Sequence, residues 1–145
     1  MNEQYRELLF IDLCGRIPYK VRMFEIEPVN NIQSNLTLQS ISNKASVICI
    51  TPSGGVIGSS IDAFKPYLFP ISSITEEQRE EFLNIQTEER QILLNALIEY
   101  KSGKYDKIPI IAQYKQIDWL NKNHFDYRGL IKKGLAIDCT NLNVY

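Results

Sequence analysis

The stretch YKVRMFEIE, residues 19–27, alternates apolar and charged side chains, with Tyr19, Val21 and Met23 on one side of the chain. A period of two residues is typical of a half-buried β-strand. The phase slips after Met23, and Phe24 and Ile26 continue the alternation, as at a β-bulge or in a strand buried on both faces. The stretch predicts a strand early in the chain, and the fold class depends on what pairs with it.

Further short strand signals follow at once. Leu36, Leu38 and Ser40 repeat the alternation, and SVICI at 46–50 is continuously apolar from Val47, as in a central strand. TPSGG at 51–55 has the composition of a turn, after which residues 56–57 begin a returning edge strand. Such short strands with short connections favour an antiparallel meander.

Helical patterns precede and follow this region. Residues 3–14, EQYRELLFIDLC, carry a dense apolar patch that predicts a helix pressed on a core, and Gly15 is a natural C-terminal stop. Thr75 and Gln78 have the spacing of a capping box for a second helix. We expect Thr87 to cap a third helix that ends at Gly103.

Two further segments of the second half predict an irregular connector and another helix. Residues 61–74, IDAFKPYLFPISSI, hold two prolines four residues apart and predict an irregular apolar connector across the sheet. Tyr114, Ile117, Trp119 and Leu120 predict another helix. The expected fold is α+β: a single domain over residues 1–145 with an N-terminal helix, a small mostly antiparallel sheet and a helical C-terminal half packed on the sheet.

The composition excludes several classes of function. With 16 basic and 17 acidic residues the net charge is −1, which creates no overall field toward phosphate backbones or anionic lipid. Cys14, Cys49 and Cys139 lie far apart and lack zinc-ligand spacing. With no secretory start and no long apolar run, we expect a cytoplasmic protein with reduced thiols, without a membrane partner, metal or cofactor.

One glycine-rich stretch invites a comparison with phosphate-binding loops. In SGGVIGSS, residues 53–60, Gly58 is followed by two serines, whereas a P-loop needs a lysine there to reach the phosphates. The G-x-G spacing of dinucleotide-binding loops is missing as well. We interpret the stretch as a glycine hairpin.

The segment NHFDYRGLIKKGLAI, residues 123–137, gathers polar residues near the C-terminus. Asp126 is a preferred N-cap, Lys132 and Lys133 suit the negative end of a helix dipole, and Gly134 suits the left-handed position beyond it. Leu135 stands where an apolar residue folds back on the last turn. We interpret these residues as the beginning and end of a short helix, and assign no catalytic residue.

His124 is the single histidine and therefore the one side chain that ordinarily titrates near neutrality. An enzymatic reading would pair it with Cys14, Cys49 or a serine as nucleophile. The sequence brings no such partner near it. A small enzyme centred on His124, with Arg128 as an aid, is the least favoured alternative.

Three blocks of the sequence look familiar together: ELLFIDLCGRIPYKV (7–21), IDAFKPYLFPISSITEEQREEF (61–82) and DWLNKNHFDYRGLIKKGLAID (118–138). They resemble a family of small uncharacterised proteins encoded by Bacteroides-type gut bacteria, their phages and mobile elements. The resemblance implies a bacterial or phage cytoplasmic setting. It carries no functional residue with it.

Two functional hypotheses follow. The leading one is a non-enzymatic accessory or adaptor protein that binds another protein, with an interaction surface formed by His124, Tyr127, Arg128, Lys132 and Lys133 together with aromatics of the proline-rich connector. The alternative is nucleic-acid binding, because lysines interleaved with tyrosines can combine charge with base stacking. Its residues are Lys101, Lys104, Lys107, Lys132 and Lys133.

Overall fold

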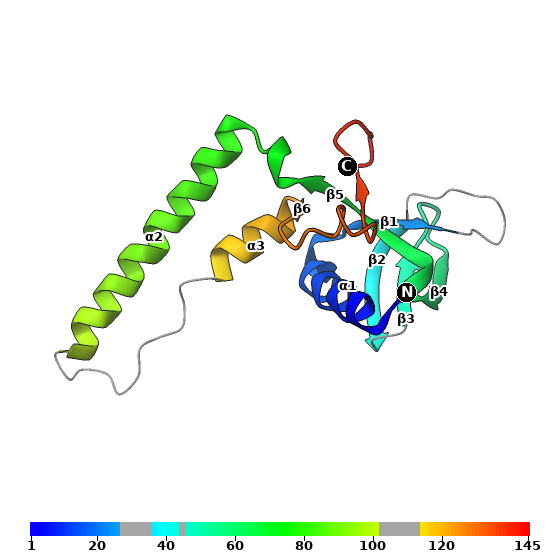
Figure 1. The fold of residues 1–145 in the computed structure, drawn as a ribbon, viewed down its shortest axis with the longest axis horizontal. Helices are drawn as coiled ribbons and strands as arrows, with labels where there is room; N and C mark the ends of the chain where they lie inside the picture. The colour runs from blue at the N-terminus through cyan, green and yellow to red at the C-terminus, as the bar shows by residue number, and fades with distance from the viewer. Residues whose placement is uncertain (27–35, 44–45, 102–113) are drawn as a thin grey trace. The chain divides into compact units, whose positions relative to one another are not determined.

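The computed structural model describes residues 1–26, 36–43, 46–101 and 114–145 (Figure 1). These residues form two compact units. Unit 1 comprises residues 1–73 and 121–145, and unit 2 comprises residues 74–120. Both helices and strands are present, so the predicted α+β class is confirmed. The expectation of a single domain stays a prediction.

Unit 1 is built on a mixed sheet. Its strands are β1 (Arg22–Glu25), β2 (Leu36–Asn43), β3 (Ser46–Ile50), β4 (Val56–Ser60), β5 (Phe64–Pro70), β6 (Phe125–Asp126) and β7 (Ile137–Asp138). The strand order is β4-β3-β2-β1-β5-β6, and β7 also pairs with β5. The longer ladders are antiparallel, as predicted, whereas β6 and β7 pair with β5 in parallel.

The prediction of an irregular connector over residues 61–74 is wrong, because Phe64–Pro70 form the strand β5. This strand pairs with β1, β6 and β7. Phe64, Pro66 and Leu68 are buried and alternate with half-buried neighbours, which is the period of a strand. The neighbouring chain bonds to β5 beside the prolines: Leu68 O accepts from Cys139 N and Phe69 N donates to His124 O. These two bonds use backbone groups of Leu68 and Phe69, and neither needs a proline N–H.

Helix α1 (Glu3–Arg16) packs on the core of unit 1. Asn2 caps it, because its side-chain oxygen accepts a hydrogen bond from Tyr5 N at 2.7 Å. Gly15 does not end the helix, contrary to the prediction. A Cβ at Gly15 would lie 2.9 Å from the amide nitrogen of Asn121, so glycine serves a close approach there instead. After α1, the 3₁₀ turn η1 (Ile17–Tyr19) leads into the sheet.

The core of unit 1 combines one face of α1 with one face of the sheet. Its fully buried apolar residues are Leu9, Leu13, Val21, Met23, Leu36, Val47, Cys49, Ile61, Phe64, Leu68 and Leu130. The 3₁₀ turns η2 (Ile61–Ala63) and η3 (Ile71–Ser73) flank β5. The core thus draws on residues from both ends of the chain, and this joins the C-terminal segment to the early strands.

Unit 2 contains α2 (Glu76–Lys101) and most of α3 (Tyr114–Lys122). The predicted capping box is confirmed: Thr75 N donates to Gln78 Oε1 at 3.0 Å, and Gln78 N donates to Thr75 Oγ1 at 3.2 Å. Thr87 starts no new helix. Its hydroxyl donates to Leu83 O at 3.0 Å, a bond that Thr makes inside a continuous helix.

The predicted helix around Ile117 is confirmed as α3. Its Trp119 is buried, with a ring centroid 5.4 Å from that of Phe82 of α2. The predicted helix end at Gly103 lies outside the described residues. Across the described part of the chain, no helix combines the length and apolar character needed to cross a membrane.

Candidate functional site

The C-terminal segment, in which the sequence concentrates its polar residues, forms successive turns after β6. The helix predicted over residues 127–133 is wrong, because Gly129 takes the left-handed conformation (φ 69°) in the middle of it. The two carboxylate oxygens of Asp126 accept hydrogen bonds from Leu130 N and Ile131 N, each at 2.8 Å. Asp126 therefore organises the turn, although it caps no helix.

The predicted stop at the end of this segment is confirmed. Gly134 has a φ of 69°, and its N–H donates to Ile131 O at 3.0 Å. Leu135 N donates to Leu130 O at 2.9 Å, and Leu135 is buried. These two bonds around a left-handed glycine are those of a Schellman motif. Local backbone chemistry thus accounts for the glycine and for the apolar residue after it.

A buried ion pair underlies the same segment. Asp12 and Arg16 of α1 are both fully buried, and Arg16 Nε donates to Asp12 Oδ2 at 2.6 Å. Arg16 Nη2 also donates to Asp12 Oδ1 at 3.1 Å and to Phe125 O at 2.8 Å. The guanidinium therefore connects α1 to β6. Sequence analysis missed this pair, although an aspartate and an arginine four residues apart on the apolar side of a helix are a readable signal.

Tyr127 and Arg128 are held against this pair. Two guanidinium groups lie over the Tyr127 ring, with Arg16 Cζ at 5.6 Å and Arg128 Cζ at 4.9 Å from its centroid. Its hydroxyl donates to Asn121 Oδ1 at 3.2 Å, and Arg128 Nε lies 3.5 Å from Asp12 Oδ1. Both side chains are half-buried and make these contacts within unit 1.

His124 has a packing partner in the C-terminal residue. Its ring stacks on Tyr145, with centroids 4.0 Å apart and planes at 13°. Burial, together with the smaller effects of the positive charges of Arg16 and Arg22, lowers the pKa of His124 to about 4. The imidazole is therefore neutral at pH 7.

The thiols do not form a nucleophilic pair with this histidine. Burial raises the pKa of Cys49 to about 12 and that of Cys139 to about 11, and it also raises the pKa of Cys14. Protonated thiols are poor nucleophiles. Within the described ranges no hydrogen bond joins His124 to a cysteine, and no group of three metal-ligating side chains occurs.

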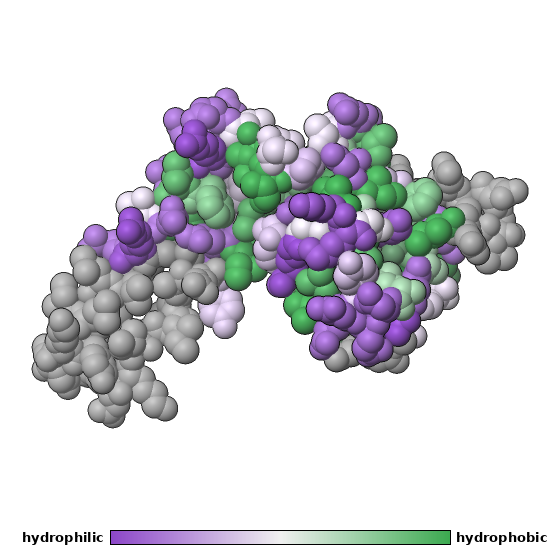
Figure 2. Space-filling view, in the orientation of Figure 1, coloured by the Kyte–Doolittle hydropathy of each residue, from purple (hydrophilic) through white to green (hydrophobic). Residues whose placement is uncertain are grey.

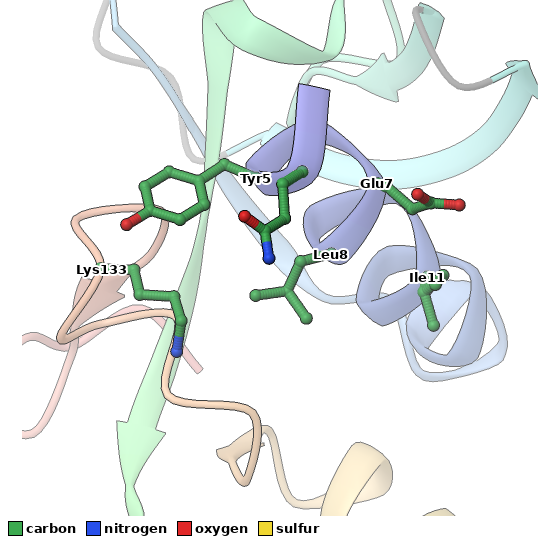
Figure 3. A pocket seen from close by; sticks show the side chains of 6 residues that line it. Tyr5, Glu7, Leu8, Ile11 and Lys133 are labelled. Atoms are coloured by element: carbon green, nitrogen blue, oxygen red, sulfur yellow. The ribbon is translucent and has the colours of Figure 1, made fainter. Parts of the chain in front are cut away.

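An open pocket lies along the solvent side of α1, and we call it the α1 pocket (Figure 3). Its volume is about 330 Å³. It is lined by Gln4, Tyr5, Glu7, Leu8, Ile11 and Lys133. Positions 4, 7, 8 and 11 follow the spacing of one helix face, so the floor is essentially a single stripe of α1.

Two charged side chains line the pocket: Glu7 of α1, and Lys133, which is the lining residue from outside the helix. Lys133 comes from the turn segment beside the helix, and its Nζ donates to Arg128 O and Gly129 O, each at 3.3 Å. An ammonium group has three protons, so one donor is left for an acceptor in the pocket. Lys133 is exposed, which keeps this donor accessible.

The structure brings together few of the residues that the sequence put forward. Of the five in the predicted interaction surface, Lys133 lines the α1 pocket and Lys132 is exposed beside it, whereas His124, Tyr127 and Arg128 contact residues inside unit 1. Lys104, Lys107 and the side chain of Lys101 lie outside the described residues. Of the connector aromatics, Tyr67 and Phe69 are half-buried in ring contacts.

Sequence analysis missed that Ile11 stays exposed in the α1 pocket, whereas Tyr5 and Leu8 pack partly against the core, as predicted. The signal was present, because the apolar arc of residues 3–14 is wider than one buried face requires. Figure 2 shows hydrophobic residues interspersed with hydrophilic ones on the visible face of the protein. Neither protein-family models, nor curated proteins, nor solved structures provide a match to this chain.

Proposed function

We propose that this protein is a non-enzymatic adaptor that binds another protein through the α1 pocket. The observation that carries the proposal is an apolar stripe of α1 that stays partly exposed, although Tyr5 and Leu8 also pack against the core. Ile11 keeps 45% of its surface exposed, and Tyr5 and Leu8 are half-buried beside it. Exposed apolar side chains gathered in a depression are typical of binding sites.

The shape of the pocket favours an amphipathic helix of the partner as its occupant. The floor is one helix face with residues at intervals of three and four, and such a face packs best against the ridge of a second helix. At about 330 Å³ the pocket is at the low end of the range for small-molecule sites. It suits one or two apolar side chains projecting from a helix.

Lys133 adds a chemical requirement on the partner. The ammonium is held by two carbonyl oxygens at the rim and has one donor left over. A carboxylate placed one turn from the apolar anchor of the partner would accept a hydrogen bond from that donor. We therefore infer an amphipathic helix with leucine-like anchors and a flanking Asp or Glu.

Several finer expectations accompany this proposal. The setting is the cytoplasm of a bacterium or phage-infected cell, in line with the sequence resemblance. The predicted packing of α2 and α3 on the sheet belongs to the same proposal. No step of the binding model depends on either expectation.

The proposal is tested by affinity capture from the native host with three forms of the chain. The pocket variant carries Leu8→Glu and Ile11→Glu, which place charge on the apolar stripe of the α1 pocket. The matched control carries Cys14→Glu, an exposed position of the same helix outside the pocket. Wild type and control should both retain a specific partner, and the pocket variant should lose it. Retention by all three forms contradicts the proposal.

A further inference from the structure

The strand β4 is the first strand in the order of the sheet, and among the described strands it pairs with β3 alone. All five of its residues pair with β3, from Ile50 opposite Val56 to Ser46 opposite Ser60. Its sequence, VIGSS, contains no charged residue and no proline. Edge strands of monomeric proteins are usually blunted by such residues, because a bare edge pairs with other strands.

The hydrogen-bond phase of the β3–β4 hairpin shows which groups face outward. Thr51 N donates to Gly55 O at 2.8 Å, which marks this pair as the hydrogen-bonded type. In an antiparallel ladder the two pair types alternate, so Ile57 and Ser59 direct their backbone groups toward β3. Val56, Gly58 and Ser60 then direct their N–H groups away from the sheet. Among the described residues no hydrogen bond uses these outward donors.

The outward residues Val56, Gly58 and Ser60 are all exposed. Val56 is 68% exposed, and a Cβ built on Gly58 would have no atom within 4 Å. Ile57, on the alternate side, packs partly against the core. The edge therefore offers backbone donors and acceptors, an exposed apolar side chain and a central glycine that a second backbone can approach closely.

We propose that β4 pairs with β4 of a second copy of this chain, antiparallel and with Gly58 on the two-fold axis. In this register Gly58 faces its own counterpart, and Val56 faces Ser60 in both halves. The three outward residues of each copy then meet three outward residues of the other, so the hydrogen-bonding pattern is self-complementary.

The absence of charge on β4 favours a second copy of this chain as the partner strand. An uncharged strand meets itself without repulsion, whereas a strand that selects an unrelated partner ordinarily carries charge to define it. The pairing adds about six backbone hydrogen bonds, two for each of the three facing pairs, and each bond has a modest net value. We therefore expect a weak dimer, with a dissociation constant on the order of 100 µM.

This contact is separate from the function proposed above. The α1 pocket and β4 share no residue, so each can fail without the other. A dimer would present two α1 pockets, and a partner with two helices would bind it more tightly than a monomer.

The decisive test uses two substitutions at one position. Gly58→Pro removes the outward N–H without removing a bond to β3, whereas Gly58→Ala keeps that N–H and meets no neighbouring atom. Sedimentation equilibrium of the purified chain, from about 10 µM to about 1 mM, should show a monomer–dimer equilibrium for wild type and Gly58→Ala. Gly58→Pro should shift the dissociation constant at least about tenfold upward.

A second pair of variants protects the test against misfolding of Gly58→Pro. Val56→Lys puts a charged side chain at each end of the pairing edge, opposite Ser60, and should weaken the dimer because edge lysines oppose strand pairing, whereas Val56→Thr should leave it within about twofold. Far-ultraviolet circular dichroism checks that each variant is folded. Wild type that stays monomeric at about 1 mM overturns the proposal. A dimer unaffected by both Gly58→Pro and Val56→Lys overturns it equally, because pairing then lies elsewhere.

Discussion

Asp12 and Arg16 form a bidentate ion pair in which neither side chain has any exposed surface. The pair spans one turn of α1, and a third bond from Arg16 reaches the backbone of β6 at Phe125. A helix from the start of the chain is thereby fixed to a strand that follows 109 positions later. Since buried charges are expensive unless paired, this contact constrains how the two ends of the chain assemble.

Asp12→Ala should destabilise the protein by about 3–5 kcal/mol, because it leaves the Arg16 guanidinium buried without its counter-ion. The matched control is Asp62→Ala, which removes an equally short but partly exposed pair with Arg6 at 2.6 Å and should cost about 1 kcal/mol or less. Urea unfolding followed by circular dichroism measures both. Equal losses would show that burial of the Asp12–Arg16 pair has no energetic consequence.

Asp126→Ala should cost about 1–3 kcal/mol, because the N–H groups of Leu130 and Ile131 lose their acceptors. Asp126→Asn keeps one carbonyl oxygen as an acceptor and should lose less. The free energy of unfolding of the two variants gives the comparison. If Asn and Ala are equally damaging, the carboxylate charge rather than the hydrogen bonds holds the turn.

The stability of the protein should fall as the pH decreases from about 6.5 to about 4. Burial lowers the pKa of His124 in the folded state to about 4 from an ordinary 6.5, so the unfolded chain takes up the proton first. Above this window the imidazole is neutral in both states and contributes no pH dependence.

The comparison variant is His124→Asn, since asparagine tolerates the positive φ of 58° at this position. The variant loses the ring stack on Tyr145, at a cost of about 0.5–1.5 kcal/mol at pH 7. Its disadvantage relative to wild type should shrink as the pH falls through the window. A difference in unfolding free energy that is constant from pH 7 to 4 would contradict a buried neutral imidazole.

Gly134→Ala should destabilise the protein by about 1–2 kcal/mol, because an L-residue is strained at φ 69°. Gly58→Ala serves as the control, since its φ is not positive and its surroundings are open. Thermal unfolding of both variants at neutral pH measures the difference. Equal melting temperatures would mean that the turn after Ile131 is not held as described.

Much of the sheet was predictable because its signals are local. The alternation around Val21 and Met23, the apolar run at 46–50 and the turn composition at 51–55 each describe a strand or turn without reference to the rest of the chain. The capping box of Thr75 and Gln78 is equally local. These features were confirmed, except that Tyr19, predicted as part of the first strand, lies in η1 and the strand begins at Arg22.

The errors have physical causes of two kinds. At β5 the prolines argued against a strand, but the bonds to neighbouring strands fall beside them. At 127–133 the pattern of caps favoured a helix, but Gly129 adopts a conformation that no helix contains. At β5 distant hydrogen-bond partners decided the outcome, whereas at 127–133 the backbone conformation of one glycine decided it.

The candidate site was less predictable than the fold. Ile11 and Lys133 lie 122 positions apart in the sequence, and only tertiary structure brings them to one pocket. The apolar residues of α1 were assigned to the core, since a sequence cannot show which part of a wide apolar arc stays uncovered. Lys133 alone among the proposed surface residues reached the pocket.

The central claim is that the α1 pocket receives a segment of another protein. Site-specific photo-cross-linking tests it most directly, with p-benzoylphenylalanine in place of Ile11 inside the pocket or of Cys14 on the same helix outside it. After irradiation in the native host, the Ile11 position should yield a discrete adduct with a second polypeptide, and the Cys14 position should not. No adduct from Ile11, or equal adducts from both positions, would contradict the account.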